Sequence, residues 1–194
     1  MSATPAAAVV IGASVGAIEA LSHILPELPR AYAFPVLVVV HLPRDKRSSL
    51  AELFSVRSQM RVKEAEDKEP IGKGIIYFAP ADYHLLVEPD FTLSLSSDEP
   101  VLYSRPAIDV LFQSAADAYG SNLTGIVLTG ASKDGAAGLQ SIAAAGGATF
   151  VQDPETAEGA TMPLAALAAC PAARVLSLEQ IASALLTEDF CLPK

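Results

Sequence analysis

The chain has 194 residues, of which 51% are hydrophobic and 18% are charged, and its formal net charge is −9. Such a composition is inconsistent with a disordered chain, and the negative charge argues against nucleic acid or an anionic lipid surface as the main partner. No apolar run approaches the roughly 20 residues that a membrane-spanning helix needs, and no basic segment precedes the short apolar stretch near the N-terminus. We therefore expect neither direct membrane insertion nor secretion.

The length fits one domain over residues 1–194, large enough to bury one substantial core. The two cysteines, Cys170 and Cys191, lie near the end of the chain without the spacing of metal ligands. A reduced, cytoplasmic protein explains them most simply, with a disulfide between them as the less favoured alternative.

Short β-branched runs alternate with alanine-rich amphipathic segments, which predicts an α/β fold: a doubly wound, mainly parallel sheet with helices on both faces. Strands are expected at residues 8–11, 36–40, 75–79, 125–128 and 149–151, with weaker candidates at 61–65 and 174–176. Helices are expected at residues 17–25, 48–57, from Pro106 to a cap at Gly120, at 135–145, and after a capping box of Ser177 and Gln180. Residues 83–97 alternate around a Glu-Pro-Asp turn, which predicts an antiparallel hairpin added to the main sheet.

Three reactive side chains follow the predicted strands. Ser14 lies in a glycine turn after the first strand, within a G-x-S-x-G pattern, and His41 directly follows the second strand. Asp134 lies in the glycine-rich connection LTGASKDGAAG after the strand that ends near residue 128. Because functional groups of open parallel sheets gather beyond the carboxyl ends of the strands, we expect the three to meet at one edge. A nucleophile, a base and an orienting carboxylate are the set that acyl transfer requires.

Each of these residues also has a purely structural interpretation. A serine in a strand-to-helix turn is often a helix cap, a histidine beside an apolar strand is often a packing residue, and an aspartate before a glycine is often an N-cap. The placement of all three at one edge favours chemistry over three coincidences. His84 follows another strand end, and we expect it to line the wall of the same crevice. The dispersed histidines indicate no metal site.

Two other enzyme classes with α/β folds fit this pattern poorly. An α/β-hydrolase orders its triad as Ser, Asp, His, whereas the order here is Ser, His, Asp. A Rossmann oxidoreductase needs G-x-G-x-x-G and an acidic residue about 20 positions later. The stretch GASVGA lacks that spacing, and His41 stands where the acid after the second strand should be.

Several blocks, in order, resemble the catalytic domain of CheB-type chemotaxis protein-glutamate methylesterases over roughly residues 7–187. The blocks are VVIGASVGAIEAL, VVVHLPRD, VKEAEDKEPIGKGIIYFAPADYHLLVE, YSRPAIDVLFQSAADAYG, GIVLTGASKDGAAGL and VQDPETAEGATMP. The resemblance implies Ser14, His41 and Asp134 as the catalytic triad, the same residues that the strand ends indicate. It also implies removal of methyl esters from glutamates on the cytoplasmic helices of chemoreceptors, with deamidation of particular glutamines as a further activity. No metal or other cofactor is expected.

The chain departs from the family pattern around the crevice. Val15 stands where the family usually has Thr, Ala131 and Ser132 replace Met and Gly before the aspartate, and Leu164 replaces the basic residue that commonly follows the family's Met-Pro. We expect the loops at these positions to hold the oxyanion through backbone N–H groups, and Met162 to line the crevice wall. The triad residue types are intact, so the departures should affect substrate preference and rate more than reaction type.

Two other functions stay open at this point. One is an esterase or deamidase of the same type that acts on a protein other than a chemoreceptor, and the other is a non-catalytic module that presents its crevice to a signalling partner. Almost nothing precedes the first predicted strand, so the resemblance covers the catalytic domain alone. We therefore expect no control by phosphorylation of a receiver domain within this chain.

Overall fold

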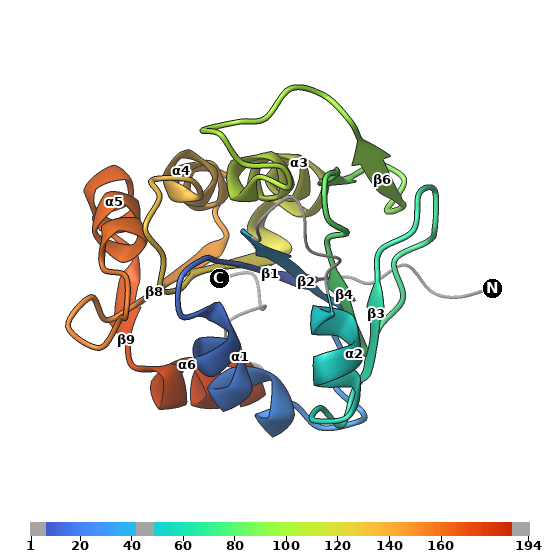
Figure 1. Ribbon diagram of the computed structural model, residues 1–194, viewed down its shortest axis with the longest axis horizontal. Coiled ribbons are helices and arrows are strands. Elements are labelled where there is room, and N and C mark those ends of the chain that lie inside the picture. The colour runs from blue at the N-terminus through green and yellow to red at the C-terminus, as the bar shows by residue number, and fades with distance from the viewer. Residues whose placement is uncertain (1–6, 42–48, 188–194) are drawn as a thin grey trace.

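The computed structural model describes residues 7–41 and 49–187, and in these a seven-stranded parallel sheet lies between two layers of helices (Figure 1). The strands lie in the order β3-β4-β2-β1-β7-β8-β9, with the first strand in the middle. Their bounds are β1 Ala8–Ala13, β2 Val36–Val40, β3 Arg61–Glu64, β4 Ile75–Phe78, β7 Leu123–Val127, β8 Ala148–Gln152 and β9 Arg174–Leu176. All five predicted strands and both weaker candidates are confirmed.

Helices cover both faces of the sheet, as the alternating pattern predicts. One layer contains α1 Ala17–Ile24, the 3-10 turn η1 Leu25–Glu27, α2 Leu50–Ser55 and α6 Leu178–Leu186. The other layer contains α3 Ile108–Tyr119, which the 3-10 turn η2 Gly120–Asn122 follows, α4 Ala136–Ala144 and α5 Thr161–Ala169 (Figure 1). The doubly wound α/β architecture is therefore confirmed.

Three helices differ in detail from the prediction. The expected helix at 48–57 begins at Ser48, which lies outside the described residues, and α2 ends at Ser55. Helix α3 begins two residues after Pro106, because Ala107 has an extended backbone and serves as the N-cap. Helix α5 was not expected, since its sequence TMPLAALAA is apolar all round and shows no helical periodicity. The capping box of Ser177 and Gln180 is present.

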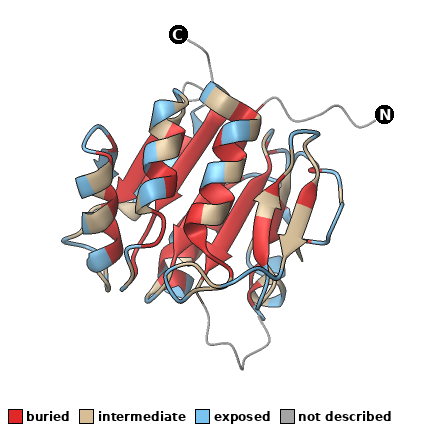
Figure 2. Cartoon of the chain, turned by 90° about the horizontal axis from the view of Figure 1, so that it is seen from above, coloured by how far each residue is buried: buried red, intermediate tan, exposed pale blue. Residues whose placement is uncertain are grey.

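The central strands explain why the core is continuous on both faces. Every residue of β1 and β2 is buried, and successive residues point to opposite faces. Val10 packs into the cluster beneath α3 and α4, while Val9 and Ile11 pack into the cluster beneath α1 and α6. Figure 2 shows one face of this arrangement, with buried strands beneath helices whose outer sides are exposed.

The predicted hairpin forms, but it does not extend the main sheet. Strands β5 His84–Val87 and β6 Leu93–Ser96 pair with each other in an antiparallel register and make a separate two-stranded sheet. Strand β3 already occupies the edge beside β4, and the apolar side chains Leu85 and Leu93 are buried in the cluster that includes α3. Burial against a helix therefore places the hairpin on the α3 layer.

Candidate active site

The carboxyl ends of β2, β1 and β7 lie side by side, because β1 pairs with both of the other strands. Ser14 directly follows β1, and His41 directly follows β2, where its backbone N–H donates to the Ala13 carbonyl at 3.1 Å. The chain after β7 passes Asp134 and enters α4. Helices α1 and α4 cover opposite faces, so this edge is a switch point of the sheet, where α/β proteins bind ligands (Figure 1).

A glycine turn fixes Ser14 at the end of β1. Gly16 is the N-cap of α1 and has φ 80°, a left-handed conformation that favours glycine. A Cβ atom at Gly16 would lie 2.8 Å from Oε2 of Glu158, so the turn has no space for a side chain. The Ser14 backbone N–H donates to the Thr129 carbonyl at 2.9 Å, and helix α1 has no side-chain cap. Ser14 is therefore not the helix cap that the structural interpretation allows.

The loop after β7 packs directly against Ser14. A Cβ atom at Gly130 would lie 3.0 Å from Cβ of Ser14 and 2.7 Å from the sulfur of Met162. Met162 is 1% exposed and donates its backbone N–H to the Gly130 carbonyl at 2.9 Å. The structure thus places Met162 beneath the loop as a packing residue, and not on the crevice wall where we expected it.

His41 and Asp134 form a short hydrogen bond at the edge of the sheet. Nε2 of His41 lies 2.7 Å from Oδ2 of Asp134, and the two side chains are 12% and 0% exposed. An ionised carboxylate only accepts hydrogen bonds, so Nε2 carries the proton in the neutral imidazole and Nδ1 is left as the acceptor. This tautomer is the one that a general base acting through Nδ1 requires.

Asp134 is held by the beginning of α3. Its Oδ2 accepts the backbone N–H of Ile108 at 2.6 Å, and its Oδ1 accepts the N–H of Asp109 at 2.9 Å. Both contacts come from the first turn of α3, where free backbone N–H groups point towards an acceptor. The N-cap of α4 is Gly135, so Asp134 is not a cap of the helix that follows it. Asp134 caps a helix from another part of the chain.

The Ser14 hydroxyl makes no hydrogen bond to His41 within the described ranges. Nδ1 of His41 instead lies 3.4 Å from Oγ of Ser104, a weak contact. The structure thus joins the imidazole and carboxylate and places the serine close by without the third link. Sequence reasoning missed Ser104, because the loop before α3 carries no strand-end signal; only its place in the block YSRPAID marked it.

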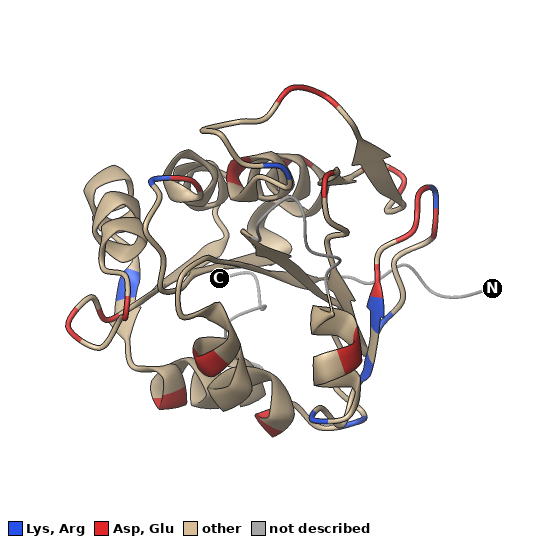
Figure 3. Ribbon diagram, in the orientation of Figure 1, with Lys and Arg blue, Asp and Glu red and all other residues tan. Residues whose placement is uncertain are grey.

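Ser14 and His41 both line one open pocket of about 550 Å³. Its other lining residues include Gly16, Ala17, Ile18, Glu19, Ser22, Val40, Arg57 and Glu158. Arg57 is the only Lys or Arg side chain among these described residues, and it donates to Oγ of Ser22 at 3.0 Å. Acidic side chains occur in both helical layers and many loops, with few Lys and Arg residues between them (Figure 3). The pocket shares this acidic character.

Two loops beside Ser14 carry backbone N–H groups that have no acceptor in the described part of the chain. Val15, Gly16 and Ala131 lie in the two loops beside Ser14, and their N–H groups donate to no acceptor among residues 7–41 and 49–187. The hydroxyl of Ser132 is already engaged, since it accepts the backbone N–H of Asp134 at 3.1 Å. The Val15 side chain is 46% exposed on the rim of the turn. Unpaired N–H groups of this kind can hold an oxyanion.

His84 is a buried structural residue and does not line the pocket that contains Ser14 and His41. Its Nδ1 accepts the backbone N–H of Ala107 at 3.2 Å, and its Nε2 donates to the Glu99 carbonyl at 3.1 Å. The side chain is 2% exposed. His84 therefore ties the loop that carries Ser104 to the start of α3, in place of the wall position that we expected.

Two other kinds of site are absent from the described residues. No group of three or more His, Cys, Asp and Glu side chains in the described part of the chain could hold a metal ion. No described helix is long and apolar enough to cross a membrane. Cys170 is a free, buried thiol, and Cys191 lies outside the described residues.

The chain is similar to known proteins along most of its length. The family model for CheB methylesterase matches residues 9–185. A Leptospira interrogans protein with a name of the protein-glutamate methylesterase/protein-glutamine glutaminase type is 45% identical over 182 residues, which cover 94% of each chain. A Chromohalobacter salexigens protein-glutamate methylesterase/protein-glutamine glutaminase is 39% identical over 92% of this chain and 51% of its own length, so the chain spans about half of that relative. The crystal structure of the Thermotoga maritima CheB methylesterase catalytic domain matches with a TM-score of 0.88 and 34% identity, over 93% of this chain and 97% of that one.

Proposed function

Because the chain belongs to the CheB methylesterase family, we propose that it hydrolyses methyl esters on glutamate side chains of chemoreceptor proteins. The reaction is an acyl transfer to a serine followed by hydrolysis. The observation that carries the proposal is the 2.7 Å hydrogen bond between His41 and the fully buried Asp134, at the pocket that also holds Ser14.

In the proposed first step, Nδ1 of His41 takes the proton of the Ser14 hydroxyl as its oxygen attacks the ester carbonyl. Asp134 keeps the proton on Nε2 and stabilises the imidazolium that forms. Nδ1 lies 3.4 Å from Oγ of Ser104, so the proposed step requires the Ser14 hydroxyl to turn towards Nδ1. A catalytic hydrogen bond is often long or absent without substrate, which is consistent with this step.

The developing oxyanion would be held by backbone N–H groups of the turn after Ser14 and of the loop at Ala131. These groups are unpaired among the described residues, and the two loops meet where Gly130 packs on Ser14. Backbone donors do not depend on side-chain identity. The departures at Val15, Ala131 and Ser132 are therefore compatible with an intact reaction.

The imidazolium then gives its proton to the leaving group. Methanol leaves from an ester, and ammonia leaves from a glutamine amide, so one acyl-enzyme serves both a methylesterase and a glutaminase. Water activated by Nδ1 of His41 hydrolyses the acyl-enzyme to a glutamate carboxylate. We infer that the substrates are methylated cytoplasmic helices of chemoreceptors and that the enzyme acts on them in the cytoplasm. Leu164 is 55% exposed on α5, at the position where the family resemblance leads us to expect a basic residue.

The direct test combines two measurements. An activated-ester probe should label Ser14 in the wild type, and peptide mapping should find no label on Ser104. Release of methanol from methylated receptor fragments should exceed hydrolysis of simple alkyl esters. Labelling that persists after Ser14→Ala but is lost after Ser104→Ala would reject Ser14 as the nucleophile. Hydrolysis of simple esters without any methanol from receptor fragments would reject the receptor as the substrate.

A further inference from the structure

A second buried carboxylate lies behind the proposed triad. Asp109, in the first turn of α3, is 7% exposed. Its Oδ1 accepts the backbone N–H of Gly138 at 2.6 Å and that of Gly135 at 3.0 Å, both at the start of α4. Asp134, just before α4, accepts the N–H groups of Ile108 and Asp109 at the start of α3. The two helices thus exchange acidic caps, and we name this pair, Asp109 and Asp134, the carboxylate clasp.

Local caps cannot replace the clasp. Gly135 is the N-cap of α4 with φ 96°, and a Cβ atom there would lie 2.9 Å from Cγ2 of Ile108, so a Ser or Asp does not fit at that position. The N-cap of α3 is Ala107, which has no side-chain oxygen. Helix α4 therefore takes an acceptor from α3, and α3 takes its acceptor from Asp134, in the loop just before α4.

Helices α3 and α4 also approach closely at this point. A Cβ atom at Gly138 would lie 2.5 Å from Cβ of Phe112 and 3.2 Å from Oδ1 of Asp109. The close approach brings the Asp109 carboxylate within reach of two N–H groups of α4. A shift of α4 relative to α3 would break the clasp on both sides.

The clasp is electrostatically costly, since it buries two carboxyl groups near each other. Burial raises the pKa of the Asp109 carboxyl above its usual range; the N–H of Gly138 opposes this, and the charge of Asp134 adds to the rise. Neutral Ser or Thr caps would satisfy the same N–H groups without that cost. The arrangement has one consequence that neutral caps would lack: it orients a buried carboxylate towards Nε2 of His41.

We propose that Asp109 is a positioning residue for the hydrolytic reaction, which holds Gly135 and thereby aligns the neighbouring Asp134 carboxylate with His41. The inference rests on the proposed function. The link is direct, because Asp109 binds the backbone of the residue that follows Asp134, and Asp134 binds the backbone of Asp109. Among the described residues, His41 binds Asp134 of the clasp directly, and His84 accepts the N–H of Ala107 at the start of α3.

The test compares Asp109→Ala, which removes the acceptor, with Asp109→Asn, which keeps an acceptor but removes the charge. Asp109→Ala should lower kcat by about 10- to 100-fold with KM unchanged, by analogy with residues that orient metal ligands. Asp109→Asn should recover most of kcat but move the acid limb of the pH profile of kcat/KM to lower pH, because a negative charge near the imidazolium is lost. Asp117→Ala and Asp117→Asn, on the exposed side of the same helix, should change neither quantity.

A second readout does not depend on substrate. The proton on Nε2 of His41 should give a low-field resonance in the wild type and in both Asp117 variants, and that resonance should shift or broaden in Asp109→Ala. A folded Asp109→Ala protein with unchanged kcat, pH profile and resonance would overturn the inference. So would Asp109→Asn that loses stability while its pH profile and resonance stay as in the wild type. If the wild type hydrolyses no receptor ester, the proposed function fails, but the resonance still tests the alignment.

Discussion

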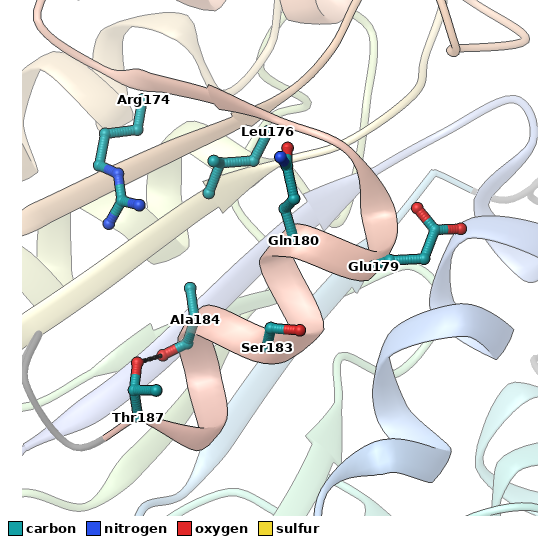
Figure 4. A pocket seen from close by; sticks show the side chains of 7 residues that line it. All are labelled: Arg174, Leu176, Glu179, Gln180, Ser183, Ala184 and Thr187. Atoms are coloured by element: carbon teal, nitrogen blue, oxygen red, sulfur yellow. Dashed lines mark hydrogen bonds between the residues drawn. The ribbon is translucent and has the colours of Figure 1, made fainter.

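Two pockets of similar size open at different places on this sheet, and only one of them contains a set of groups suited to acyl transfer. The pocket at the carboxyl edge, with Ser14 and His41, measures about 550 Å³. The other measures about 470 Å³ and lies between β9 and α6 (Figure 4). Its lining residues are Arg174, Leu176, Glu179, Gln180, Ser183, Ala184 and Thr187. Both pockets contain a serine and a carboxylate, so volume and residue types do not separate them.

The difference lies in what the polar groups contact. In the β9–α6 pocket the polar groups form hydrogen bonds at the two ends of α6. At the first end, the side-chain carbonyl of Gln180 accepts the backbone N–H of Ser177, and the carboxylate of Glu179 accepts the Ser177 hydroxyl. At the last end, the Thr187 hydroxyl donates to the Ala184 carbonyl at 3.0 Å. At the carboxyl edge the polar groups come from three strand ends and converge, and Asp134 is fully buried. Acyl transfer depends on such groups being held in place before the substrate binds, and the buried hydrogen bond of Asp134 to His41 provides this at the carboxyl edge.

The largest expected effect separates the two pockets by their serines. Ser14→Ala should lower kcat for methyl ester hydrolysis by about 10⁶, by analogy with serine proteases whose triads act as a unit. Ser183→Ala, on the exposed side of α6, is the matched control and should leave kcat unchanged. Steady-state methanol release measures both. Equal rates for Ser14→Ala and the wild type would remove the distinction between the pockets.

The second effect concerns the buried carboxylate that the β9–α6 pocket lacks. Asp134→Asn should lower kcat by about 10⁴, because the amide N–H facing the imidazole favours the wrong tautomer. In that orientation the amide oxygen still accepts the N–H of Asp109, but the N–H of Ile108 loses its acceptor, so circular dichroism should be used to show that the variant is folded. Glu179→Gln is the control from the other pocket. A loss of less than tenfold in a folded Asp134→Asn protein would contradict the assigned role.

Much of this edge could be predicted from sequence, because it depends on strands that are apolar throughout. The runs that became β1, β2 and β7 end directly before glycine turns or His41, and parallel pairing then brings their ends together. The clasp could not be predicted in this way. The strand ends predict Asp134 as a partner of His41. Its contacts with α3 depend on how α3 and α4 pack on each other, which the sequence pattern does not report.

His84 and Met162 are two residues whose burial the sequence pattern does not predict. Both follow or flank loops at the carboxyl edge, so the sequence placed them on the crevice wall. Their burial depends on neighbours that periodicity does not report: the Ala107 N–H for His84 and the close approach of Gly130 for Met162. Ser104 could not be predicted, because its loop follows no strand of the main sheet. The loop lies beside His41 through tertiary contacts, among them the hydrogen bond of His84 to the Glu99 carbonyl.

The third prediction tests how tightly the carboxyl edge is packed. Gly130→Ala introduces a Cβ atom that would meet Met162 at 2.7 Å and Cβ of Ser14 at 3.0 Å. Overpacking of this kind should lower the free energy of unfolding by about 1–3 kcal/mol, and the displaced Ser14 should lower kcat. In the double variant with Met162→Ala, stability should partly return while kcat stays low, because the contact with Ser14 remains. Full recovery of kcat in the double variant would contradict this prediction, because it would show that the loop at Gly130 can shift without displacing Ser14.

The smallest expected effect concerns the N-cap of α6, beside the β9–α6 pocket, and should leave kcat unchanged. Ser177 accepts the Gln180 N–H at 3.2 Å as the N-cap of α6, so Ser177→Ala should lower the free energy of unfolding by about 1 kcal/mol. For a protein of this size that corresponds to a fall in Tm of roughly 2–4 °C. Chemical denaturation and methanol release, measured on the same preparation, should show reduced stability and an unchanged kcat. A lower kcat would mean that α6 is coupled to the carboxyl edge, and the two pockets would then not be independent.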